Sequence, residues 1–158
     1  MSMDERIEYR ALPMAGMERQ RRSRVRREKG RDPYDGLRPW SAITHGVGAV
    51  LGVIGTVLLL VRTVMLGSGW VSAAAFLIYG LSMIGLYTAS TLYHCLNTGV
   101  AGRIALRKYD HISIYFLIAG SYTPICLLTL PHDGGIPMLL IVWAVALLGT
   151  VMALVWID

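Results

Sequence analysis

The chain has 158 residues, of which 54% are apolar and only 16% are charged, against the roughly 25% charged residues usual in soluble domains. Eleven of its 15 lysine and arginine residues precede Trp40, and the rest of the chain is almost uncharged. This distribution excludes a single water-soluble globule and a wholly disordered chain, and two cysteines are too few for a disulfide-framed secreted domain.

Residues 1–38 form a polar, charged segment without sustained helical or strand periodicity. We predict a basic cytoplasmic tail that is largely disordered. Its arginine-rich run, Glu18 to Arg31, contains no aromatic residue on which bases could stack, so it indicates anionic lipid or a topology signal rather than nucleic acid. No apolar stretch of a cleaved signal peptide precedes residue 40, which predicts that the first hydrophobic segment stays in the membrane.

Four apolar stretches follow the tail and make up a predicted transmembrane domain over residues 39–158. Each is close to the roughly 20 residues that a helix needs to cross a bilayer core, and none alternates with the period of a barrel strand. We therefore predict an all-α fold, a polytopic bundle of transmembrane helices in which sequential helices are antiparallel neighbours. The helices are expected at about 43–66, 70–93, 112–130 and 136–157.

Basic residues between the predicted helices indicate the orientation of the chain in the membrane. Arg103, Arg107 and Lys108 fall between the second and third helices, whereas residues 131–135, between the third and fourth, contain no lysine or arginine. Because successive connections alternate sides, the tail and residues 95–110 share one side, which the excess of basic residues assigns to the cytoplasm. We expect a multi-pass protein of the inner or plasma membrane of a bacterium, with a cytoplasmic N-terminus.

Five polar side chains are expected near the cytoplasmic ends of three predicted helices. The first helix begins with one of them, the second ends with two, and the third begins with two. Ionisable residues in membrane helices are costly and usually face the bundle interior or a wet cavity, so a shared depth predicts a site. In chain order these residues are His45, Ser90, His94, Asp110 and His111.

Ser90 and His94 are four residues apart and therefore project from one face of a helix. If His94 binds a metal ion, Ser90 can hold or polarise a metal-bound water, and Asp110 can orient that water or accept its proton. Zinc suits an imidazole ligand and lowers the pKa of its bound water toward ~7, which supplies hydroxide at neutral pH. A Ser-His-Asp relay is the alternative, and we rank it lower because Ser90 lacks the sharp turn of a nucleophile elbow.

The same residues can also have purely structural roles. His45 can be an interfacial residue or a helix cap, and Asp110 can be the N-cap of the third helix. His111 follows Asp110 directly, so the two side chains project about 100° apart from a regular helix. We favour Asp110 facing the site, with His111 in a structural or hydrogen-bonded role.

Several short motifs together resemble the haemolysin III family, which belongs with the progestin and adipoQ receptors and, more remotely, the alkaline ceramidases. They are Thr-His-Gly at 44–46, Ser-Thr-Leu-Tyr-His at 90–94, Tyr-Asp-His at 109–111 and Ala-Gly-Ser-Tyr-Thr-Pro at 119–124. The resemblance covers about residues 39–158. It implies a seven-helix membrane core with a zinc site near the cytoplasmic face, in which His94 is a zinc ligand, Ser90 the neighbouring serine and Asp110 the aspartate of the third helix.

The resemblance also implies two further zinc histidines in a His-x-x-x-His motif on a seventh helix, and the 158 residues contain no such motif. We therefore expect a chain truncated after four of the seven helices. Its zinc site would be incomplete, with His45 and Asp110 as the available substitute ligands. Helix faces that the missing helices would cover favour a homo-oligomer.

The family name implies a cytolytic, pore-forming or membrane-homeostasis role. The site chemistry implies instead a zinc-dependent hydrolase that cleaves amide or ester bonds of a lipid-like substrate. A membrane receptor or regulator without catalysis is a third alternative, and the sequence alone does not choose among them. The expected partners are the lipid bilayer, anionic lipid at the tail and further copies of the chain.

Overall fold

The computed structural model describes residues 37–130 and 132–156, so the predicted basic tail and its contacts with anionic lipid fall outside the described residues, apart from its last two positions. The described residues form helices and short connections, which confirms the predicted all-α fold. Each of the four long helices is long and apolar enough to cross a membrane. The elements are α2 (Pro39–Met65), α3 (Gly69–Cys95), α4 (Val100–Pro124), the π-helical segment η1 (Ile125–Thr129) and α5 (His132–Trp156).

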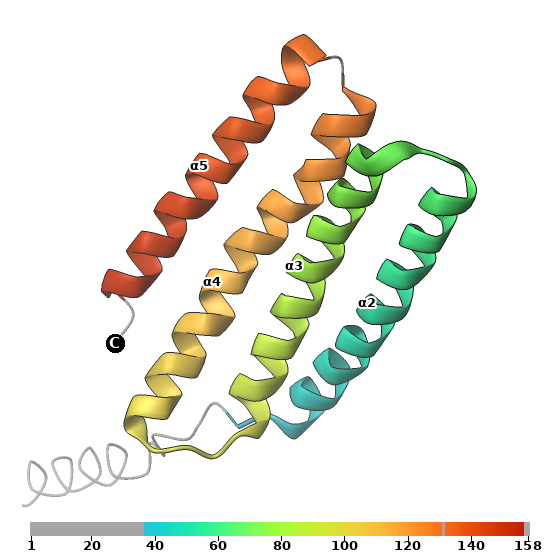
Figure 1. Ribbon diagram of the computed structural model, residues 1–158. Helices are drawn as coiled ribbons and strands as arrows, with labels where there is room; N and C mark the ends of the chain where they lie inside the picture. Colours follow the sequence, from blue (N-terminus) through green and yellow to red (C-terminus); the bar gives the residue numbers. More distant parts are fainter. Residues whose placement is uncertain (1–36, 131, 157–158) are drawn as a thin grey trace, which may run out of the picture. The chain divides into compact units, whose positions relative to one another are not determined.

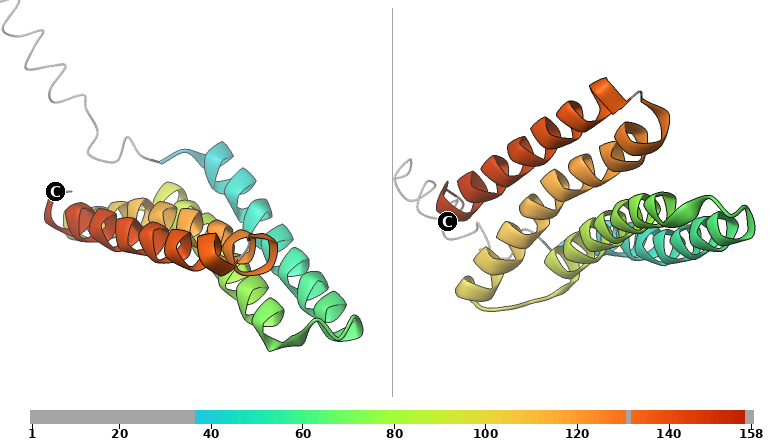
Figure 2. Two further views of the ribbon diagram at one scale, coloured as in Figure 1. Left: turned by 90° about the horizontal axis from the view of Figure 1, so that it is seen from above. Right: turned by 45° about the horizontal axis from the view of Figure 1, so that its top comes forward.

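The four helices lie side by side in chain order, each antiparallel to the next (Figure 1). Helix α3 packs against α2 and α4, and α5 packs against α4 and η1. Within the described part of the chain α2 and α5 do not touch, so the helices form an open row rather than a closed bundle. Figure 2 shows the same order of neighbours in two further views.

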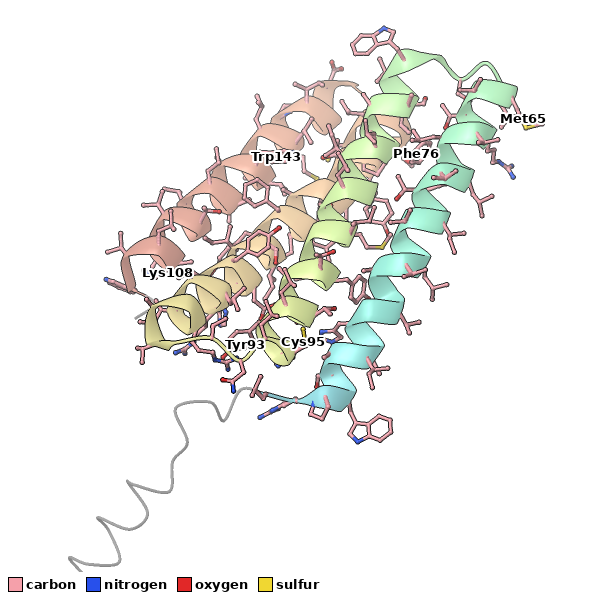
Figure 3. All side chains as sticks on the ribbon, turned by 60° about the horizontal axis from the view of Figure 1, so that its bottom comes forward. Met65, Phe76, Tyr93, Cys95, Lys108 and Trp143 are labelled. Carbon is pink, nitrogen blue, oxygen red and sulfur yellow. The ribbon has the colours of Figure 1, made fainter. Side chains whose placement is uncertain are left out.

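Large apolar side chains cover the outward faces of the helices (Figure 3), whereas the buried positions are mainly alanine, glycine, serine and threonine. This is the inverse of a water-soluble core and typical of membrane helices, which associate through small residues. Trp40 and Trp70 are 80% and 81% exposed and lie at opposite ends of the helices, where aromatic residues meet the headgroups. The exposed surface therefore fits a lipid bilayer.

Glycines allow the helices to approach closely where they cross. A Cβ atom at Gly80 of α3 would collide with the side chain of Thr56 on α2. At Gly149 of α5 it would lie 2.7 Å from the ring of Tyr115 on α4. A Cβ atom at Gly120 of α4 would likewise collide with the side chain of Ser82 on α3. Each neighbouring pair of long helices therefore has at least one glycine position that leaves no room for a side chain.

Helix α4 begins at Val100, twelve residues before the predicted start at 112, and the connection before it shrinks to residues 96–99. The predicted helix begins where the apolar stretch begins, and residues 100–111 are more polar. Arginine, lysine, leucine and alanine are, however, among the best helix formers, so the helix continues past the apolar segment. As a result Asp110 and His111 lie well inside α4, and the N-cap role for Asp110 is excluded.

Two basic residues of α4 interact with the carboxyl ends of its neighbours. The Arg103 Nη1 atom donates a hydrogen bond to the backbone carbonyl of Tyr93 on α3, at 2.7 Å. The Lys108 Nζ atom donates to the backbone carbonyl of Leu154 on α5, at 2.9 Å. Cations at helix carboxyl ends interact favourably with the free carbonyls and the helix dipole, so these side chains fasten α4 to both α3 and α5.

The fourth helix also starts earlier than predicted, at His132 instead of 136. Asp133 in its first turn favours a helix amino end there. The preceding segment η1 follows Pro124, which has no N–H group for a regular α-helical bond. In η1 the Leu130 N–H group donates to the carbonyl of Ile125, five residues back, at 3.1 Å.

Candidate functional site

A hydrogen bond between His45 and Ser90 joins α2 to α3. The His45 Nδ1 and Ser90 Oγ atoms are 2.8 Å apart, and Ser90 is only 5% exposed. His45 lies in the second turn of α2, so it is not a helix cap. The structure thus gives the buried Ser90 hydroxyl an imidazole partner from the neighbouring helix.

His94 lies next to this pair. Its ring centroid is 5.9 Å from that of His45, with the two ring planes inclined by 62°. Tyr87 packs edge-on against His45 at 5.9 Å, and Tyr93 lies 5.1 Å from His94. We call His45, Ser90 and His94 the histidine cluster.

The histidine cluster lies near one end of the helices. Figure 3 shows Tyr93 and Cys95, which flank His94, at the end of α3 that meets the start of α2, with Met65 at the far end of α2. The backbone N–H group of Arg38 donates to the carbonyl of His94 at 3.2 Å, which ties the start of α2 to the end of α3. In a membrane-spanning chain the cluster would thus lie close to one face of the bilayer.

Among the described residues, no hydrogen bond, ion pair or ring contact joins Asp110 or His111 to the cluster. The His111 Nδ1 atom donates to the carbonyl of Arg107 on its own helix, at 2.8 Å. The Asp110 carbonyl accepts a hydrogen bond from Ser113 at 2.7 Å, and its carboxylate has no hydrogen-bond or ion-pair partner in the described part of the chain. The catalytic role of Asp110 therefore stays a prediction.

The described residues do not fit a complete zinc site. Zinc takes about three or four protein ligands, and the described residues contain no group of three or more His, Cys, Asp or Glu placed to hold a metal ion. The histidine cluster supplies two imidazoles, and one nitrogen of His45 is engaged by Ser90. Zinc binding at His94 stays a prediction that needs donors from elsewhere.

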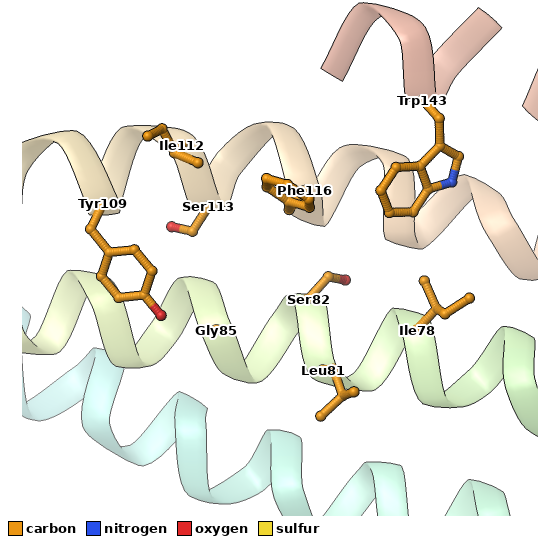
Figure 4. A pocket seen from close by; sticks show the side chains of 9 residues that line it. All are labelled: Ile78, Leu81, Ser82, Gly85, Tyr109, Ile112, Ser113, Phe116 and Trp143. Carbon is orange, nitrogen blue, oxygen red and sulfur yellow. The ribbon is translucent and has the colours of Figure 1, made fainter. Parts of the chain in front are cut away.

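A cavity of about 370 Å³ lies between α3 and α4, with one wall from α5 (Figure 4). Its lining is mainly apolar, with the hydroxyl groups of Tyr109, Ser82 and Ser113 as the polar exceptions. In Figure 4 the Tyr109 side chain extends from α4 toward α3. This volume is at the small end of ligand pockets and suits an apolar group. The other lining residues are Ile78, Leu81, Gly85, Ile112, Phe116 and Trp143.

Three residues that contact the cluster or its neighbours were not predicted from the sequence as site residues: Tyr87, Tyr93 and Arg103. Tyr87 is three residues before Ser90 and seven before His94, so the helical repeat places all three on one face of a helix. That spacing could have indicated Tyr87 as a neighbour of the site. Tyr93 and Arg103 had no such signal, because their interaction connects two different helices.

Comparisons with known proteins identify a family and two relatives of the chain. The family described as Haemolysin-III related matches residues 39–158. The "Hemolysin-3 homolog" of Bacillus subtilis (strain 168) is 40% identical over 118 residues, which are 75% of this chain and 54% of the relative. The "Hemolysin-3" of Bacillus cereus is 36% identical over 117 residues, 74% of this chain and 52% of the relative. No solved structure matches.

The family match includes every described helix and the whole histidine cluster. At the same time, the chain spans about half the length of the curated relatives that it matches.

Proposed function

Since the chain belongs to the haemolysin III-related family and is a multi-pass membrane protein, we propose that it acts in the bilayer by making it permeable, as a cytolytic or pore-forming protein. The observation that carries this proposal is that the family match runs through all four membrane-length helices, and that two relatives named as hemolysins are 36% and 40% identical to the chain. The similarity therefore includes the part of the chain that sits in lipid.

The open row of helices supports an assembly. Four helices in a row enclose no channel, and neither α2 nor α5 has a second long neighbour among the described residues. Permeability on this proposal requires further spanning helices, either from other copies of the chain or from the remainder of a protein of the relatives' length. The predicted homo-oligomer is thus one of the two ways in which the proposal supplies these helices.

Dye release from lipid vesicles tests permeability. We expect the purified protein to release an encapsulated dye from vesicles of phosphatidylcholine and phosphatidylglycerol, with a steeper than linear dependence on protein concentration. His94→Ala is expected to leave this release unchanged, because a channel does not require the imidazole. Protein that floats with the vesicles but releases no dye would contradict the proposal, and loss of release in His94→Ala would favour hydrolysis instead.

A hydrolase that acts on lipid amide or ester bonds is the second candidate. Two observations favour it: the buried Ser90 hydroxyl bonded to His45 beside His94, and the apolar cavity between α3 and α4 that could receive a lipid chain. In this candidate the cluster would bind and orient the polar group of the substrate.

Metal content separates the hydrolase candidate from a structural role for the cluster. We expect the purified 158-residue chain, dialysed after exposure to zinc, to retain well under one zinc ion per chain, because its described residues supply two clustered imidazoles. His94→Ala should lower the retained amount further in mass-spectrometric metal analysis. Full occupancy would show that we have misjudged the set of ligands.

We also propose that the N-terminus and the start of α4 face the cytoplasm. Cysteines introduced at Ala105 and Gly134, in a background with Cys95→Ser and Cys126→Ser, test this orientation. Both positions are exposed, and a Cβ at Gly134 meets nothing within 4 Å. A membrane-impermeant thiol reagent should label position 134 in intact cells and position 105 only after the membrane is opened. The opposite pattern would reverse the topology.

A further inference from the structure

Arg103 is a buried cation without a carboxylate partner in the described part of the chain. It is 8% exposed, although it belongs to the basic end of α4. Its Nη1 atom donates to the Tyr93 carbonyl at 2.7 Å, and its guanidinium carbon lies 4.5 Å from the centre of the Tyr93 ring. One side chain of α4 thus holds both the backbone and the ring of the same residue on α3.

Tyr93 belongs to the last turn of α3, where carbonyl groups lack partners within the helix. Arg103 satisfies the Tyr93 carbonyl, and the N–H group of Arg38 satisfies the carbonyl of His94. The turn that carries His94 is therefore held from two sides, by the segment before α2 and by α4.

We propose that Arg103 is a positioning residue for the histidine cluster. It fixes Tyr93, the Tyr93 ring packs 5.1 Å from the His94 ring, and His94 lies 5.9 Å from His45. His45 in turn holds Ser90. The inference concerns the cluster of the hydrolase candidate, and it depends on the placement of these rings rather than on any turnover.

The chemistry of this contact requires arginine. A planar guanidinium can donate to a carbonyl and stack on an aromatic ring at the same time, whereas a lysine ammonium is a point donor that fills the first role alone. Arg107, one turn further along α4, is exposed and provides a matched control for loss of a positive charge.

The ring resonances of labelled histidines report the placement directly. With the chain in lipid nanodiscs at one fixed pH, we expect Arg103→Gln to shift or broaden the signals of His94 and His45. The signal of His111, whose ring is bonded within α4, should stay in place. Arg107→Gln should move neither His94 nor His45, and Arg103→Lys should give shifts smaller than Arg103→Gln.

Hydrogen exchange provides a second measurement that does not use the histidines. The backbone amides at the end of α3, through Leu96, should lose about tenfold in protection in Arg103→Gln, because a charge-assisted bond that holds this turn is gone. Unchanged His94 and His45 signals, or an equal shift of His111, would overturn the inference. Either result is independent of whether the protein releases dye or hydrolyses lipid.

Discussion

Gly80→Val is expected to lower the free energy of unfolding by about 1–3 kcal/mol, the usual cost of overpacking a well-packed interior. A Cβ at Gly80 would collide with Thr56, the buried residue of α2 that faces it. Thr56 cannot move aside freely, because its hydroxyl donates to the Gly52 carbonyl at 2.6 Å. The two helices must therefore separate, and lipid does not replace the lost contacts between them.

Gly55→Val is the matched control. It lies on α2, one residue before the Thr56 that faces Gly80, and a Cβ there meets nothing within 4 Å. We expect its effect to stay within about 0.5 kcal/mol, as for other substitutions away from packed contacts. Equilibrium unfolding in mixed micelles would compare the two variants. An equal loss in both would show that α2 and α3 do not pack through Gly80.

Loss of the bond between His45 and Ser90 has the second largest expected effect. In a double-mutant cycle of His45→Ala, Ser90→Ala and the double variant, we expect a coupling free energy of about 1 kcal/mol. The bond spans two helices at 2.8 Å, and Ser90 is almost fully buried. Each single variant therefore removes this bond. His45→Ala also removes the ring contacts with Tyr87 and His94, so the double variant should cost little more than His45→Ala alone.

Thr44 supplies a control for this cycle. Among the residues that the structure describes, its hydroxyl bonds only to carbonyls of its own helix, those of Trp40 and Ser41, both at 3.1 Å. Thr44→Ala combined with Ser90→Ala should therefore be additive in the free energy of unfolding. Additivity of His45→Ala and Ser90→Ala as well would contradict the bond between the helices.

The number and type of the long helices followed from the sequence, because the free energy of inserting a segment into lipid depends mainly on its local apolar length. The i, i+4 spacing of Ser90 and His94 likewise determined that both lie on one face of α3, since the helical repeat alone fixes the angle between them. Neither conclusion depends on a neighbouring helix.

Tertiary structure alone decided which side chains meet. A lipid-facing leucine and a helix-facing leucine look alike in a sequence, so the rotation of each helix about its axis cannot be derived from hydropathy. That rotation sets His45 against Ser90, leaves the Asp110 carboxylate without a partner in the described residues, and turns Arg103 toward the end of α3. The early start of α4 follows from the helix propensity of residues 100–111. The carbonyl partners that its basic side chains find on α3 and α5 were decided by the tertiary structure, because a local sequence pattern does not include those helices.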